Sequence, residues 1–243
     1  MLAQIPFTRF LNSQFAGPVD SFLEALHIHP AHPRAPISDA FAMELVVSAV
    51  LLVFFIAVRL SLSVEKPKTV QQVAEMMHEF VDDQGHSIIG HGYEGFLTFL
   101  TVLFLFILLC NLIGLVPGLK SPTADIVVPL GCALLTFVFY HLQGIRKHGF
   151  GYIKQFLGPV WWMAWLMLPL EIISHLARLL SLTVRLYANI FAGDLVTLAF
   201  FSLVPIGIPL LFLSLHVLVS VVQAFLFMAL AMSYLSLAVA EEH

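Results

Sequence analysis

Residues 161–203 read WWMAWLMLPLEIISHLARLLSLTVRLYANIFAGDLVTLAFFSL and contain one proline, Pro169, and one glycine, Gly193. No convincing turn divides this run, and a break follows at Val204-Pro-Ile-Gly-Ile-Pro209 before the sequence becomes helical again. A helix of about 43 residues would be about 64 Å long, whereas the hydrocarbon core of a bilayer is about 30 Å thick. We therefore predict that the last two helices, about 161–203 and 208–240, form a long antiparallel hairpin that is steeply tilted or bent within a membrane.

The composition supports a membrane location. Of the 243 residues, 60% are hydrophobic and 11% are charged, whereas a soluble domain has about 45–50% apolar and about 25% charged residues. A net charge of −4 gives no sign of a nucleic-acid partner, which would require a basic surface. The two cysteines, Cys110 and Cys132, lie inside apolar runs and do not indicate a disulfide framework.

Three further charge-poor runs predict membrane helices at about 40–61, 95–117 and 126–145, which makes the chain an all-α polytopic membrane protein with five membrane helices. Between the first two, apolar residues recur at helical spacing over 69–86, opposite a polar face. This pattern predicts an amphipathic helix on the membrane surface or against a partner, although a packed helix in a soluble loop fits it equally well.

Positive charge follows the first and third crossings at Arg59, Lys66, Lys68, Arg146, Lys147 and Lys154. The connector 116–125 carries only Lys120. The positive-inside rule therefore predicts that residues 1–37 form an arm outside the cytoplasm, that 38–243 form the membrane domain, and that the C-terminus is cytoplasmic.

The arm contains three histidines, His27, His29 and His32, among several prolines. They could bind a metal, but a solvated arm is favoured because no further ligands are spaced to close a site. The arm lacks the features of a secretory signal and of an Arg/Ser-rich transit segment. We expect a bacterial inner membrane protein, although an organelle-encoded chain would also lack a transit segment.

Ionisable residues interrupt the apolar sequence of the last two helices, and each costs about 3 kcal/mol in a bilayer. Steps mostly of three and four place four of them, together with three uncharged polar residues, in one polar stripe on the first of these helices: Glu171, Ser174, His175, Arg178, Ser181, Arg185 and Asn189. Asp194 follows Arg185 by nine residues and so faces the opposite side, about 180° around the helix.

Facing residues of an antiparallel pair have residue numbers that add to nearly the same total. This test pairs Asp194 with His216, Arg185 with Gln223, and His175 with Tyr234. The hairpin then carries two separate polar regions that flank a central arginine. A chance agreement of the totals stays open, because few polar residues were available to pair.

An arginine at this depth has a restricted chemistry. Its guanidinium does not deprotonate, so Arg185 cannot relay a proton, but it can interrupt a proton path and keep a nearby carboxylate ionised. The alternative is an ion pair within the chain. It is disfavoured because Glu171 lies four turns away and Asp194 points to the opposite face.

Three motifs resemble the a subunit of F-type ATP synthases. The first is Ser181-Leu-Thr-Val-Arg185-Leu-Tyr-Ala-Asn189-Ile-Phe-Ala-Gly193-Asp194, the second runs from His216 through Gln223 to Tyr234, and the third joins Asn111-Leu-Ile-Gly-Leu-Val-Pro117 to Pro122-Thr-Ala-Asp125. The resemblance covers about residues 38–240. Departures are Tyr187-Ala188 for Phe-Gly, Asp194 for the commoner Glu, and Leu179 for a common Pro.

The resemblance implies a stationary, proton-translocating subunit that faces a rotating ring of c subunits, beside b-type stator subunits and the other ATP synthase subunits. Arg185 would be the essential charge, supported by Asn189 and Gln223. Asp194 and His216 would belong to an outer half-channel, and Glu171, Ser174 and His175 to an inner one, with Tyr234 and Asn111 as possible further members. It implies no cofactor or metal and no catalysis by this chain alone, and proton rather than sodium coupling is a family-level expectation.

Two other functions fit the sequence less well. A self-contained ion channel or secondary transporter would predict an internal repeat, which the two halves of the sequence do not show. An intramembrane metalloenzyme would use Glu171, His175 and His216, but no HExxH motif is present. The sequence also lacks a GxxxxGK[ST] phosphate loop, so we expect nucleotide chemistry on other chains.

Overall fold

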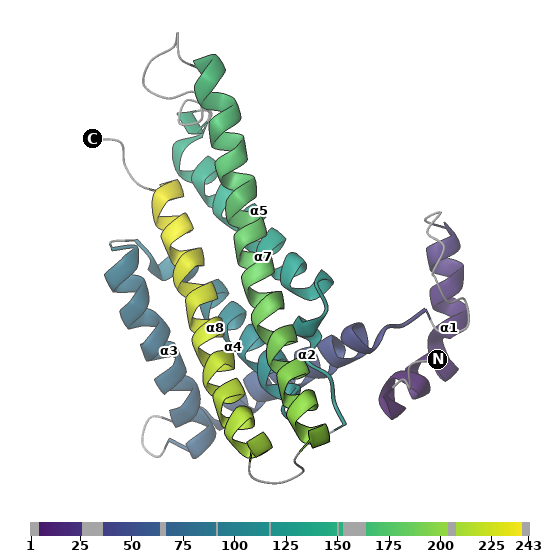
Figure 1. Ribbon diagram of the computed structural model, residues 1–243. Coiled ribbons are helices and arrows are strands. Elements are labelled where there is room, and N and C mark those ends of the chain that lie inside the picture. The colour runs from purple at the N-terminus through teal and green to yellow at the C-terminus, as the bar shows by residue number, and fades with distance from the viewer. Residues whose placement is uncertain are drawn as a thin grey trace.

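The computed structural model describes residues 5–25, 36–63, 67–90, 92–116, 118–149, 151–152, 164–203 and 208–239 (Figure 1). Within these ranges every regular element is helical. The elements are α1 (Pro6–Ala25), α2 (Asp39–Ser61), α3 (Thr69–Ile88), α4 (Glu94–Ile113), the short 3₁₀ helix η1 (Pro122–Ala124), α5 (Val127–His148), α7 (Ala164–Leu203) and α8 (Ile208–Val239).

Five helices of the described chain, α2, α4, α5, α7 and α8, are long and apolar enough to cross a membrane. This confirms the predicted all-α polytopic fold. The longest, α7, runs unbroken for 40 residues, or about 60 Å at the usual helical rise. It lies antiparallel beside α8 over much of its length (Figure 1), so the long hairpin is also confirmed. Part of the predicted break, residues 204–207, lies outside the described residues, as do residues 161–163.

The core of the bundle forms where α4 and α8 meet. Helix α8 packs against α4, α7, α5 and α3, and so has neighbours on several sides. Phe227, Met228 and Met232 of α8 are fully buried, and they join Leu186 and Ile190 of α7 in one apolar cluster. The buried residues of α7 therefore follow one helical face, which fixes the rotation of α7 about its own axis.

The hairpin between α4 and α5 is closed by a tight contact. Helix α4 ends at Ile113, earlier than the predicted residue 117, and Gly114 follows. A Cβ atom on Gly114 would lie 2.7 Å from Cβ of Ser121, so the two chain segments approach too closely for any larger residue. The Ser121 hydroxyl donates to the Cys110 carbonyl oxygen at 2.8 Å, which secures the turn.

The N-terminal arm contains a helix that the sequence analysis did not predict. Its pattern was obscured by Pro18, which lies inside α1. The helix is tied to the start of α2: the Asn12 amide donates to the Ile37 carbonyl at 3.1 Å and accepts from the Ile37 N–H at 3.0 Å. Lys120 also reaches Asp39 of α2 at 2.7 Å. The candidate ligands His27, His29 and His32 lie outside the described residues.

The amphipathic helix α3 packs against the chain's own bundle. Val81 is fully buried, and the Phe80 ring contacts Phe104 of α4 and Phe225 of α8. The Tyr93 hydroxyl donates to Asp82 at 2.9 Å, and this bond raises the pKa of Tyr93. Val70, Val73 and Met76 stay exposed, so α3 is an amphipathic helix on the surface of the bundle that packs against it through Val81 and Phe80.

A buried hydrogen-bond network joins α4, η1 and α8. Asn111 is completely buried; its amide donates to the Ser220 carbonyl at 3.2 Å and accepts from the Thr123 hydroxyl at 2.7 Å. Both halves of the amide are therefore satisfied without water, which gives Asn111 a structural role that the sequence did not indicate.

We expect Asn111→Ala to lower the free energy of unfolding by about 1–3 kcal/mol, because it leaves buried polar partners unsatisfied. A denaturant titration in detergent micelles measures this. The matched control is Ser233→Ala, whose hydroxyl bonds only within α8, to Ala229 at 2.9 Å. The control should stay within about 0.5 kcal/mol of the original chain. Equal losses in both variants would contradict the structural role of Asn111.

Candidate functional site

The polar side chains along α7 and α8 fall into three sets at different positions on the hairpin. We call Asp194 and His216 the loop-end pair, because they lie nearest the connection between the two helices. The central group consists of Ser181, Arg185, Asn189 and Gln223. The far-end cavity is lined by Tyr140, Tyr152, Glu171, His175, Arg178, Tyr234, Leu237 and Ala238.

The loop-end pair brings an acid and a histidine together across the hairpin, as the sequence analysis expected. Oδ1 of Asp194 lies 3.7 Å from Nδ1 of His216, whose side chain is almost completely buried. A Cβ atom on Gly193 would lie 3.2 Å from the His216 ring, so the absence of a side chain there lets the ring approach α7. Nε2 of His216 is buried and lacks a hydrogen-bond partner among the described residues.

In the central group, the one hydrogen bond of the Arg185 side chain among the described residues is to a polar neighbour on its own helix. Its Nη2 donates to the Ser181 hydroxyl at 3.4 Å, and among the described residues it has no acidic partner. The two acids of α7 that could have paired with it contact other side chains: Asp194 lies against His216, and Glu171 against His175. The internal ion pair weighed above is therefore not formed.

Asn189 and Gln223 contact each other. The Asn189 amide donates to Oε1 of Gln223 at 2.8 Å, one helical turn beyond Arg185. The sums of residue numbers predict that Gln223 faces Arg185. In the structure Gln223 instead contacts Asn189, which lies one helical turn from Arg185. Direct support of the arginine by these two amides stays a prediction.

Arg185 lies at the edge between the buried and exposed faces of α7. Leu182 and Leu186 point into the bundle, whereas Val184 is 51% exposed. The stripe that contains Arg185 also carries Ser181 and, farther along, the small exposed residues Ala188 and Ala192. The guanidinium therefore emerges beside an apolar outer surface with little side-chain bulk around it.

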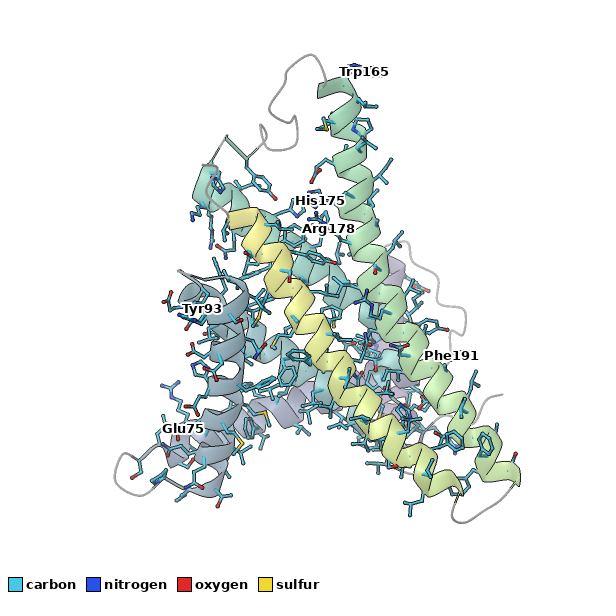
Figure 2. All side chains as sticks on the ribbon, turned by 60° about the vertical axis from the view of Figure 1, so that its left-hand side comes forward. Glu75, Tyr93, Trp165, His175, Arg178 and Phe191 are labelled. Atoms are coloured by element: carbon cyan, nitrogen blue, oxygen red, sulfur yellow. The ribbon has the colours of Figure 1, made fainter. Side chains whose placement is uncertain are left out.

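The far-end cavity has a volume of about 140 Å³ and collects groups from α5, α7 and α8 together with Tyr152, which follows α5. Nε2 of His175 lies 3.3 Å from Oε1 of Glu171, and Nδ1 of His175 lies 2.8 Å from the Tyr140 hydroxyl. The guanidinium carbon of Arg178 lies 5.3 Å from the Tyr234 ring centre, a cation–π contact. Figure 2 shows His175 and Arg178 close together where α7 passes the C-terminal part of α8.

The sequence analysis did not predict all of the residues that line this cavity. Tyr140 and Tyr152 were not singled out, although the apolar run 126–144 contains one histidine, His141. Tyr140 precedes that histidine, so the pair was the available signal. Tyr234 was expected to face His175; it shares the cavity with His175 but contacts Arg178. Ser174 lies half-buried on α7, next to His175.

The residues considered for a metal site are not gathered in one place. Glu171 and His175 lie together in the far-end cavity, whereas His216 lies with Asp194 in the loop-end pair. A polytopic bundle that keeps ionisable side chains within its spans is typical of proteins that pass ions across membranes. The fold and the three polar sets define that class.

Comparison with known proteins identifies the family within this class. A family model described as ATP synthase A chain matches residues 41–236. The chain is 54% identical over 241 residues to ATP synthase subunit a of Koribacter versatilis, covering 99% of this chain and 98% of that protein. It is 43% identical over 209 residues to subunit a of Solibacter usitatus, covering 86% and 90% of the two chains. The corresponding protein of Geobacter sulfurreducens is 39% identical over 222 residues, covering 91% and 94%.

The chain therefore belongs to the ATP synthase a subunit family, and the resemblance drawn from the sequence motifs is confirmed. Members of this family are subunits of the membrane sector of F-type ATP synthase. Membership indicates that this chain takes part in ATP synthesis and proton transport as a non-catalytic subunit. The chain is also a multi-pass membrane protein, as its five apolar helices indicate.

Proposed function

We propose that this chain is the stationary subunit that guides protons to and from a rotating c-subunit ring, with Arg185 as the charge that separates two half-channels. The observation that carries the proposal is the state of Arg185. Among the described residues, this permanently charged group has no acidic partner, and it emerges beside an apolar surface. A buried or lipid-depth cation without a counter-charge is costly, so an acid of another chain is its natural partner.

The surface around Arg185 suits such a partner. Ser181, Ala188 and Ala192 are small and exposed on the same stripe. Small residues let helices approach closely within a membrane, so a ring helix that carries a carboxylate can come near the guanidinium. The ring carboxylate is held ionised while it passes, because an adjacent positive charge favours the charged form of an acid.

The loop-end pair and the far-end cavity provide the two half-channels. A proton from outside passes Asp194 and His216, reaches the deprotonated ring carboxylate and neutralises it. The neutral carboxyl turns through the lipid with the ring. It then gives up its proton to the other half-channel, at Glu171, Ser174 and His175. Arg185 cannot carry a proton between the two paths because its guanidinium does not deprotonate.

The orientation follows from this arrangement and from the distribution of basic residues. The N-terminal arm lies outside and the C-terminus in the cytoplasm, and the loop-end pair lies toward the outer side. The chain is assigned to a bacterial inner membrane, in line with its bacterial relatives, where it would contact b-type stator subunits as well as the ring. Each proton that crosses 100 mV releases about 2.3 kcal/mol, so several protons are needed for each ATP.

We expect Arg185→Ala and Arg185→Lys to abolish ATP-driven proton pumping by the complete complex in sealed vesicles, while ATP hydrolysis sites stay intact. Alanine removes the charge, and lysine cannot reproduce the planar guanidinium. A pH-sensitive dye inside the vesicles measures pumping. The matched control is Arg59→Ala, which removes an exposed arginine at the end of α2 and should leave pumping unchanged. Normal pumping by both Arg185 variants would reject the proposal.

We expect Asp194→Asn and His216→Ala each to slow pumping several-fold rather than abolish it, because water can partly replace one member of a proton path. The double variant should be no slower than the worse single variant, since both changes interrupt the same pair. The control is Asp83→Asn, on the exposed side of α3. Unaltered rates in the single variants would remove the loop-end pair from the path.

A further inference from the structure

The far-end cavity contains a hydrogen-bonded row that extends beyond the residues of the proposed half-channel. Its members, in order, are Tyr140 of α5 and then His175 and Glu171 of α7. We infer that Tyr140 positions His175, and through it Glu171, for proton release. This role rests on the proposed function, because it concerns the same half-channel.

With Glu171 ionised and His175 neutral, the two contacts of the imidazole assign the direction of each hydrogen bond. An ionised carboxylate can only accept, so Nε2 of His175, 3.3 Å from Oε1 of Glu171, carries a hydrogen. In a neutral imidazole the other nitrogen is then an acceptor, and Nδ1 receives the Tyr140 O–H at 2.8 Å. Tyr140 thus selects the one tautomer of His175 that offers its N–H to Glu171.

Tyr140 is itself held firmly. The residue is 2% exposed, and its ring lies among those of Phe137, His141, His175 and Tyr234. The rings of Tyr140 and His175 are nearly parallel, with centres 5.9 Å apart and planes 22° apart. A hydroxyl on a ring packed in this way has few other positions, so it restrains the rotation of the imidazole as well as its tautomer.

Glu171 is the member of the row that meets solvent, since its side chain is 41% exposed whereas that of His175 is 10% exposed. The arrangement therefore runs from a fixed, buried phenol to an accessible acid. Arg178 lines the same cavity but cannot relay a proton, which leaves Glu171 as its acid–base group nearest to water. A correctly aimed N–H from His175 keeps that carboxylate in one orientation, ready to take up a proton and pass it on.

The test uses Tyr140→Phe in the complete ATP synthase in sealed vesicles, with the rate of ATP-driven proton pumping as the readout. Phenylalanine keeps the buried ring and removes only the hydroxyl. We expect pumping to fall several-fold while the complex assembles and hydrolyses ATP. The matched control, Tyr93→Phe, removes a hydroxyl that bonds to Asp82 on the α3 side, and should pump normally.

A double-mutant cycle separates positioning from a general packing effect. If Tyr140 acts through His175, Tyr140→Phe causes no further loss in a His175→Ala background, whereas independent packing defects add. Should Tyr140→Phe fail to assemble, 3-fluorotyrosine at position 140 keeps the shape and alters the donor strength. Its effect on pumping should be present with His175 and absent with His175→Ala.

Pumping at the original rate in Tyr140→Phe, or additive losses in the cycle, would overturn the inference. These outcomes are distinct from failure of the proposed function, which the Arg185 variants test. If Arg185→Ala abolishes pumping and Tyr140→Phe does not change it, the half-channel assignment stands and the positioning role alone is rejected.

Discussion

The α7–α8 hairpin has to accommodate the charged guanidinium of Arg185 within a helix long enough to span a membrane, and the rest of its arrangement depends on this requirement. The group stays ionised whatever its surroundings, so the helix must present it where a counter-charge or water can reach it. The buried face of α7, with Leu186 and Ile190 against α8, sets the rotation that brings Arg185 to the edge of the bundle. Asp194 and Glu171 each lie against a histidine, and among the described residues the guanidinium has no acidic partner.

The two acid–histidine contacts differ in the structure that holds them together. At the loop end, Asp194 and His216 come from two helices, so their distance depends on how closely α7 and α8 pack near Gly193. In the far-end cavity, Glu171 and His175 are one turn apart on the same helix, and their relation follows from the helix itself. Helix α5 adds the Tyr140 hydroxyl, 2.8 Å from His175, and the rings of Phe137 and His141, which also contact His175. The bundle thus holds one site by tertiary packing and the other mainly by local structure.

Much of this arrangement could be predicted from sequence because it follows from periodicity. Charge-poor runs gave the membrane helices, and the lack of a turn between residues 164 and 203 gave the long α7. The contact of Asp194 with His216 followed from antiparallel geometry. Side-chain partners between helices that are not sequence neighbours could not be found in this way. The bond from Tyr140 to His175 and the buried amide of Asn111 depend on how α5 and α4 pack, which no single-chain pattern encodes.

The great length of α7 has an electrical consequence. Glu171 and Asp194 are separated by about 35 Å along the helix, more than the hydrocarbon thickness of a bilayer, with Arg185 between them. If water follows each polar set inward, the conducting solution on either side reaches far toward the middle of the bilayer. The transmembrane voltage then drops over the short insulating layer around the guanidinium, where the electric field is concentrated well above its average across the membrane.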